Sequence, residues 1–170
     1  MKTALVHDDL IQAGGAERVV SHFHRLWPDA PLYTSVYDRR STLSDFDDAD
    51  IRTSFLQRTP LSNRRFHKLA LPLFPAAFEA MDFKGNDLVL SSSSRFAKGV
   101  ITDPEICHIC YCHTPARFAW RPQDYFSRSR TSRLLWPLMS VRLHRLRVGD
   151  LESEVRVDYY IANSHNVAMR

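Results

Sequence analysis

Apolar positions along this chain form short runs that alternate with stretches of helical spacing. Residues 3–7 are an apolar run that ends in charge, which is typical of a buried parallel strand. Apolar side chains within 16–26 recur at helical spacing, and the Trp-Pro pair that follows closes that predicted helix. Residues 32–37 alternate as a strand does. The chain therefore opens as a β-loop-α-β unit, which builds parallel sheets.

The remaining residues also divide into predicted loops, strands and helices. Five aspartates in 38–50 indicate a surface loop, and 51–55 reads as an edge strand. We expect two short helices in 60–81, broken at Pro72 and Pro75. The other predicted elements are strands at 87–91, 106–112 and 158–162, a serine run at 91–94, and a long helix at 130–154 interrupted near Pro137.

These elements predict an α/β fold with a Rossmann-like, doubly wound and mostly parallel sheet that carries helices on both faces. A length of 170 residues suits one domain. The final residues, 167–170, lie inside an apparent helix that has no cap. We therefore expect the chain to have been cut, or its reading frame to be incomplete, just after a domain boundary.

Three cysteines, Cys107, Cys110 and Cys112, fall within one predicted strand. An odd number so closely spaced is not a disulfide framework, and no second pair follows at zinc-finger spacing. The sequence therefore predicts buried, reduced thiols that act as small apolar residues, and it predicts no metal site.

Positive charge is concentrated between Arg117 and Arg147. This window holds eight arginines and one acidic residue, Asp124, so it carries +7 in a chain whose net charge is +4. Such a window favours a polyanionic partner, either a phosphate, an anionic membrane or a nucleic acid. The sequence contains neither a run of about 18 apolar residues nor a secretory signal, which predicts a cytosolic location.

Gly14 and Gly15 stand between the first strand and the first helix. There the backbone can approach a ligand and helix-start N–H groups can meet an anion, although neither a dinucleotide fingerprint nor a P-loop is matched. A tight turn that needs glycine dihedrals explains the pair equally well.

His113 lies at the end of another predicted strand, in the segment Tyr-Cys-His-Thr-Pro that ends at Pro115. It could donate to a substrate hydroxyl or carry a proton, although a histidine bonded into a strand end is the commoner case. We expect Thr114 to cap a new helix whose first turn holds Pro115. Asn163 and Ser164 follow the last strand at the same edge and are also good helix caps.

The serine run at 91–94 belongs to no nucleophile elbow, and no acid can be assigned as its partner. We therefore reject a serine hydrolase.

Several segments match a known pattern in order, and this similarity covers nearly the whole chain. Together they resemble the amino-terminal domain of family 4 glycosyltransferases, in the mannosyltransferase-like branch of O-antigen and exopolysaccharide assembly. The matching segments are His-Asp at 7–8, Gly-Gly-Ala-Glu-Arg-Val at 14–19, Thr-Ser-Phe-Leu-Gln at 53–57, Leu-Pro-Leu-Phe-Pro at 71–75, Asp-Leu-Val-Leu-Ser-Ser-Ser at 87–93, Ala-Lys-Gly-Val at 97–100, Tyr-Cys-His-Thr-Pro at 111–115 with Trp120, and Tyr-Ile-Ala-Asn-Ser at 160–164.

The resemblance implies one half of a GT-B enzyme, which holds the acceptor while a second domain, absent from this chain, binds the nucleotide-sugar. It implies transfer of a hexose such as mannose to a glycan or lipid-linked acceptor, with retention of configuration and without metal or cofactor. Gly14 and Gly15 would then line the cleft near the donor diphosphate, and His113 would contact the transferred sugar. We place Asn163 and Ser164 near the interdomain edge and count Arg117 among the substrate-binding residues.

Three positions beside the expected site depart from the family pattern. Asp9 stands where relatives often have Trp, Ala116 where they often have Met, and Arg121 where they often have Asp. The choice of acceptor is therefore expected to differ.

The arginine window suits an anionic membrane surface beneath a lipid-linked acceptor, although a solvated helix face explains it as well. Nucleic acid is not expected, because no binding motif accompanies the charge. The alternative to an enzyme is a non-catalytic, ligand-binding Rossmann-like domain that lacks the donor half.

Overall fold

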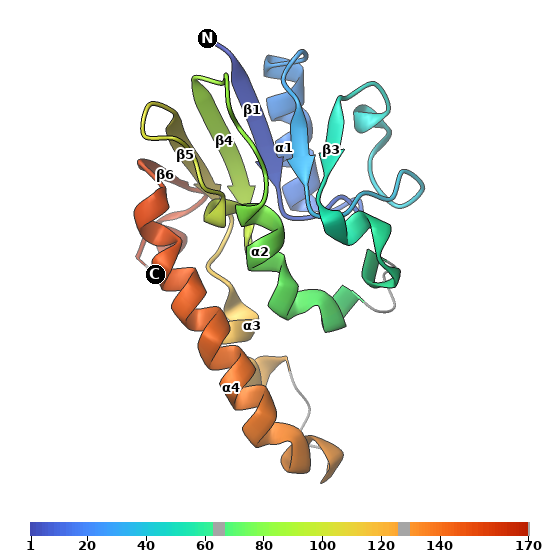
Figure 1. The fold of residues 1–170 in the computed structure, drawn as a ribbon, viewed down its shortest axis with the longest axis vertical. Coiled ribbons are helices and arrows are strands. Elements are labelled where there is room, and N and C mark those ends of the chain that lie inside the picture. The colour runs from blue at the N-terminus through green and yellow to red at the C-terminus, as the bar shows by residue number, and fades with distance from the viewer. Residues whose placement is uncertain (63–66, 126–129, 170) are drawn as a thin grey trace.

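The computed structural model describes residues 1–62, 67–125 and 130–169, and its described strands form one parallel sheet (Figure 1). The strand order is β3-β2-β1-β4-β5-β6, and every neighbouring pair is parallel. This confirms the predicted α/β, Rossmann-like doubly wound fold. The strands are β1 (Thr3–His7), β2 (Leu32–Thr34), β3 (Ile51–Thr53), β4 (Leu88–Ser93), β5 (Cys107–Cys112) and β6 (Tyr159–Ala162).

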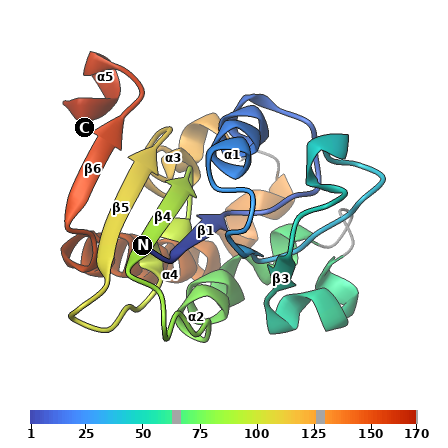
Figure 2. The same cartoon turned by 90° about the horizontal axis from the view of Figure 1, so that it is seen from above.

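Helices cover both faces of this sheet. Viewed from above, α1 lies on one side, while α2 and α4 lie on the other (Figure 2). The α-helices are α1 (Gly15–Leu26), α2 (Phe74–Glu79), α3 (Arg117–Trp120), α4 (Arg130–Glu152) and α5 (His165–Ala168). Short 3-10 turns join them: η1 (Ser44–Phe46), η2 (Phe55–Arg58), η3 (Pro60–Ser62), η4 (His67–Leu73), η5 (Ala97–Gly99), η6 (Pro122–Asp124) and η7 (Glu154–Arg156).

The core divides into two layers because successive side chains of a strand point to opposite faces. Leu5 and Leu90 pack with Val20 of α1 in one layer. Val6 and Val89 pack with α2 residues in the other. Each fully buried aliphatic or aromatic side chain contributes about 1.5–3 kcal/mol relative to an exposed one, so both layers hold the helices on the sheet.

The two central strands account for the apolar runs in the sequence. Every residue of β1 and β4 is buried, as expected for strands covered on both faces. β3 is an edge strand, as predicted, and β6 forms the opposite edge with its side chains largely exposed.

Two strands differ in length from their predictions. β2 ends at Thr34, because the next residues turn to follow the loop after β1: Ser35 bonds to the Asp8 carbonyl and Tyr37 bridges to Leu10. β4 continues through Ser93, so Ser92 and Ser93 lie buried within the strand rather than beyond it.

Several loops and helices also differ from their predictions. The polar stretch 38–50 is not wholly a surface loop, because η1 buries Phe46 against the α1 layer. Pro72 lies within η4, and Pro75 lies in the first turn of α2, where the missing N–H costs nothing. Residues 63–66 lie outside the described part. α4 continues through Pro137 without the expected interruption.

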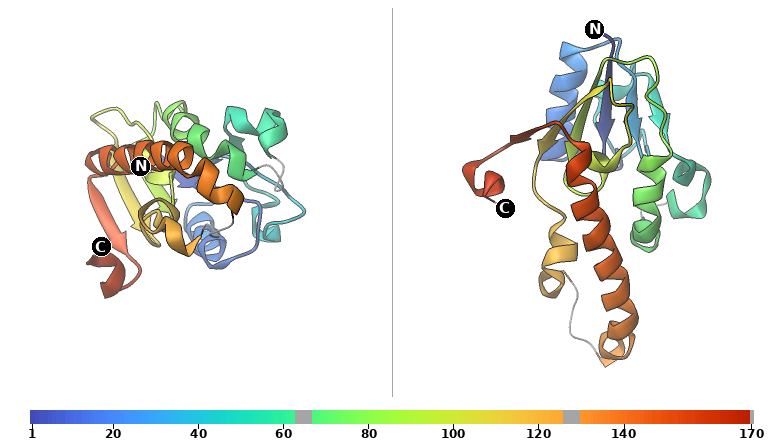
Figure 3. Two further views of the ribbon diagram at one scale, coloured as in Figure 1. Left: turned by 90° about the horizontal axis from the view of Figure 1, so that it is seen from below. Right: turned by 60° about the vertical axis from the view of Figure 1, so that its left-hand side comes forward.

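α4 projects away from the sheet beyond the carboxyl ends of the strands (Figures 1 and 3). Its C-terminal half packs on the domain through Leu143 and Leu146, which are buried. Among the described helices, none combines the length and apolar character needed to cross a bilayer.

Candidate functional site at the carboxyl edge of the sheet

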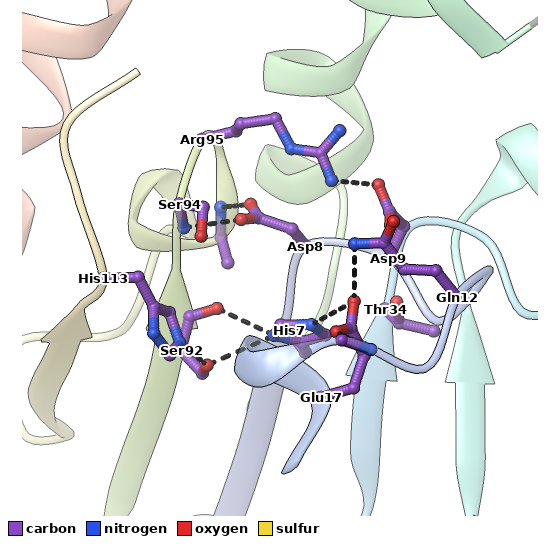
Figure 4. A network of polar contacts seen from close by, with 12 residues as sticks. His7, Asp8, Asp9, Gln12, Glu17, Thr34, Ser92, Ser94, Arg95 and His113 are labelled. Carbon is purple, nitrogen blue, oxygen red and sulfur yellow. Dashed lines mark hydrogen bonds and ion pairs between the residues drawn. The ribbon is translucent and has the colours of Figure 1, made fainter. Parts of the chain in front are cut away.

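A chain of polar side chains runs along the carboxyl edge from the start of α1 to the end of β5 (Figure 4). The His7 ring lies with Nε2 3.8 Å from Glu17 Oε1 and Nδ1 3.0 Å from the Ser92 carbonyl oxygen. Ser92 Oγ is in turn 2.8 Å from His113 Nε2. Neighbouring strands place these groups in register, since His7 pairs with Ser92 across β1 and β4.

Glu17 anchors this chain at the first turn of α1. Its carboxylate accepts hydrogen bonds from the Gly14 backbone N–H at 2.9 Å and from Gln12 Nε2 at 3.1 Å. Burial works against ionisation of Glu17, but hydrogen bonding and the charge of His7 outweigh burial and hold its pKa below the ordinary value. The carboxylate is therefore charged inside the domain, at the positive end of a helix.

The glycine pair serves a purpose other than turn geometry. Neither Gly14 nor Gly15 has a positive φ; among the residues described, Gly85 does. A Cβ built on Gly14 would lie 2.7 Å from Glu17 Oε2, whereas one on Gly15 would meet no atom within 4 Å. Because Gly14 has no Cβ, the Glu17 carboxylate can come close enough to accept a hydrogen bond from its backbone N–H. Gly15 faces open space.

Asp8 and Asp9 fix the loop that follows β4. Asp8 accepts backbone N–H bonds from Ser94 at 2.6 Å, Phe96 at 2.8 Å and Ala97 at 2.9 Å. Asp9 is buried and forms an ion pair with Arg95. Burial lowers the pKa of Arg95, but the charges of Asp9 and Asp8 outweigh it, so the net shift is upward.

A cavity of about 680 Å³ lies at the carboxyl ends of β4, β5 and β6, where α3 and α4 also line it. Four cationic side chains line it, together with aromatic and small residues and two acids. Those that bear on its chemistry are Arg95, Lys98, Arg117, Arg121, Thr114 and Trp120.

Arg95 is already paired with Asp9, and Lys98 is likewise neutralised within the cavity wall. Its ammonium lies 3.0 Å from Asp150 Oδ1 and 3.8 Å from Glu154 Oε1, and the Trp120 indole N–H donates to Asp150 Oδ2 at 2.6 Å. Arg117 and Arg121 also line the cavity and are exposed. A ligand with negative charge would therefore meet the two guanidinium groups rather than Lys98.

Thr114 does not cap the helix after β5. The N-cap of α3 is Ala116, so Pro115 precedes the helix, and Thr114 lies in the segment between β5 and α3 that lines the cavity. Its Oγ1 is buried and has no hydrogen-bond partner among the described atoms. A buried hydroxyl without a partner costs free energy, so this group marks a position where a ligand or water can bind.

The predicted site residues fall into three places. Gly14 and His113 are joined through Glu17, His7 and Ser92, whereas Arg117 lines the cavity. Asn163 and Ser164 are exposed after β6. Ser164 caps α5 as predicted, its Oγ accepting from the Val167 N–H at 3.3 Å.

His113 can act as a neutral hydrogen-bonding group. Burial, followed by the charge of His7, lowers its pKa, so the ring is uncharged at neutral pH. It is half-buried, and the ring of Tyr111 contacts it edge-on at 5.1 Å between centroids. A fixed neutral imidazole can donate one hydrogen bond and accept another.

The three cysteines are free thiols; Cys110 is buried, as predicted, whereas Cys107 and Cys112 are only half-buried. Burial raises the pKa of Cys110 to about 12, which makes the thiolate inaccessible at neutral pH. In the described part of the chain, no three metal-ligating side chains come together.

Ser92 and Glu17 could not be selected from the sequence alone. Ser92 is one of four equivalent serines, and Glu17 resembles the ordinary acidic residue of a helix start. Asp8 and His7 offered a stronger signal, since a charged pair directly after a buried strand falls on the ligand-binding edge of a parallel sheet.

No protein-family model, no curated protein and no solved structure matches this chain.

Proposed function

We propose that this chain is the acceptor-side domain of a retaining glycosyltransferase of GT-B architecture. The complete protein would transfer a hexose, such as mannose, from a nucleotide-sugar to a glycan or lipid-linked acceptor. The ordered segments that resemble family 4 glycosyltransferases support this proposal, and the Rossmann-like parallel sheet is compatible with it.

One observation carries the proposal beyond the resemblance. At the carboxyl edge of the sheet, His113 is held by Ser92, and its chain neighbours Cys112 and Thr114 line a cavity of about 680 Å³ to which two exposed arginines also contribute. This volume falls in the range of small-molecule sites, roughly 300–1,000 Å³. Sugars offer hydroxyl groups to an imidazole, and phosphates bind guanidinium groups bidentately.

Each site residue would bind the part of the substrates that suits its side chain. His113 would contact a hydroxyl of the transferred sugar, and Arg117 would hold an anionic group of donor or acceptor. Gly15, which faces open space, would let the backbone approach the diphosphate beside Gly14, whose N–H is already bonded to Glu17. Asn163 and Ser164 would face the donor domain. We expect no metal and no cofactor, the nucleotide-sugar being a co-substrate.

We further propose a cytoplasmic protein that binds the inner face of an anionic membrane. α4 exposes Trp136, Leu138, Val141 and Val148, with Arg142 and Arg145 among them. Such a mixture of apolar and cationic side chains on a projecting helix suits anionic headgroups and their interface. Phe126 and Arg128 lie outside the described residues, as do the side chains of Arg130 and Arg133. No nucleic acid is proposed as a partner.

A panel of nucleotide-sugars tests the function. The complete protein is incubated with each radiolabelled donor, GDP-mannose included, and with lipid-linked acceptors, and the product's anomeric configuration is determined. Transfer with retention from one donor supports the proposal. Binding of a sugar ligand without transfer from any donor would instead favour a non-catalytic, ligand-binding domain.

A further inference from the structure

The hydrogens along the Glu17–His7–Ser92–His113 chain can be placed by elementary donor and acceptor rules. His7 Nδ1 lies 3.0 Å from the carbonyl oxygen of Ser92, and a carbonyl oxygen can only accept. Nδ1 of His7 must therefore carry a hydrogen. The opposite ring nitrogen faces the Glu17 carboxylate, which Gly14 and Gln12 hold in place. The His7 ring is thus fixed with a donor aimed at Ser92.

The hydroxyl group of Ser92 lies between the His7 and His113 rings. Its Oγ lies 3.2 Å from the same His7 Nδ1 and 2.8 Å from His113 Nε2. With the serine oxygen accepting from His7 Nδ1, its single hydrogen can be donated to His113 Nε2. His113 Nε2 then accepts, and the remaining hydrogen of the neutral ring resides on Nδ1.

We propose that His7 and Ser92 are positioning residues that hold His113 as the Nδ1–H tautomer, with Glu17 fixing the orientation of His7. His113 would then present a hydrogen-bond donor to its ligand. The ligand atom at this position must accordingly be an acceptor, such as a hydroxyl oxygen of a sugar or a phosphate oxygen. Only this assignment of the ligand rests on the proposed function, because the tautomer of His113 is set by the protein without any ligand.

The structure contains a matched control for this arrangement. Ser91 Oγ lies 2.8 Å from His108 Nε2, and His108 Nδ1 lies 2.9 Å from the Arg156 carbonyl oxygen. Ser91 and Ser92 alternate along β4, so the two serine–histidine pairs lie on opposite faces of the sheet. A change to one serine should affect one histidine only.

Long-range ¹H–¹⁵N correlation spectra of the histidine side chains, recorded at pH 7.5 without any ligand, test the proposal. His113→Gln identifies the signals of the ring. In the unmodified protein we expect the pattern of the Nδ1–H tautomer for His113. Ser92→Ala should shift His113 toward a mixture of both tautomers, whereas Ser91→Ala should alter only the His108 signals.

Variants of His7 test the part of the hydrogen-bonded series that precedes Ser92. His7→Asn can place an amide N–H near the position of Nδ1 and should preserve the His113 tautomer, whereas His7→Leu should lose it. An Nε2–H pattern for His113 in the unmodified protein would overturn the proposal. So would an unchanged His113 tautomer in both Ser92→Ala and His7→Leu. These spectra are recorded without a sugar donor or a sugar acceptor. A negative result is therefore distinct from failure of the proposed transferase function.

Discussion

At Glu17, a single buried carboxylate meets both the N-terminus of α1 and the imidazole of His7. The sequence predicts α1 correctly from its apolar spacing, and that spacing gives no reason to bury an acid. The burial follows from tertiary structure, because β1 and β4 bring His7 and Ser92 to the same edge. His113 could be selected from its place at a strand end, whereas its partners could not.

The two glycines beside Glu17 should respond differently to the same change. Gly14→Ala places a Cβ against the held carboxylate and is expected to lower the free energy of unfolding by about 1–2 kcal/mol. Gly15→Ala enters open space in a helix and should change it by less than about 1 kcal/mol, toward greater stability. Urea unfolding followed by circular dichroism compares them. Equal loss in both variants would contradict the role assigned to Gly14.

At the scale of elements, the sequence predicted where strands and helices begin better than where they end. β1, α1 and β5 agree with their patterns because apolar periodicity determines them. β2 was predicted too long because contacts of Ser35 with the loop after β1 redirect the chain. Thr114 was expected to cap a helix, and it lines the cavity because α3 starts later. Such outcomes depend on contacts between elements distant in sequence.

The ion pair of Lys98 and Asp150 joins η5, α3 and α4, since Trp120 also donates to Asp150. Asp150→Ala leaves a buried ammonium without its nearer partner and should cost about 3–5 kcal/mol. Combining Lys98→Met with Asp150→Leu should cost less than the sum of the single changes. Glu152→Ala, at an exposed position of α4, is the control and should shift stability by less than about 0.5 kcal/mol. Additive costs would contradict direct coupling.

At the scale of the whole molecule, the sheet gathers its polar side chains at one edge, and α4 projects from that edge (Figure 3). The sequence predicted the doubly wound sheet, and hence the edge. The sequence could not predict that His113 and Arg117 would lie in different parts of this edge. Arg117 lies in the cavity wall, and His113 lies in the series of polar side chains. His113 directly follows β5 and its side chain bonds to Ser92 of β4, whereas Arg117 begins α3.

The projecting helix leads to a prediction about membranes. The protein should sediment with vesicles containing anionic lipid at low salt, and less so with neutral vesicles or at high salt. Arg142→Glu combined with Arg145→Glu should weaken binding by at least roughly tenfold, since each arginine near the surface contributes about 1 kcal/mol. Arg18→Glu combined with Arg40→Glu is the charge-matched control. Equal affinity for neutral and anionic vesicles would exclude this role of α4.

The central claim is that His113 acts on the transferred sugar. The most direct measurement is the rate of sugar transfer by the complete protein carrying His113→Ala, compared with His22→Ala, which alters an exposed histidine of α1. We predict that His113→Ala lowers kcat by at least about 100-fold while the unfolding midpoint is retained, and that His22→Ala has no effect. Transfer at an unchanged rate by the folded His113→Ala protein would contradict the claim.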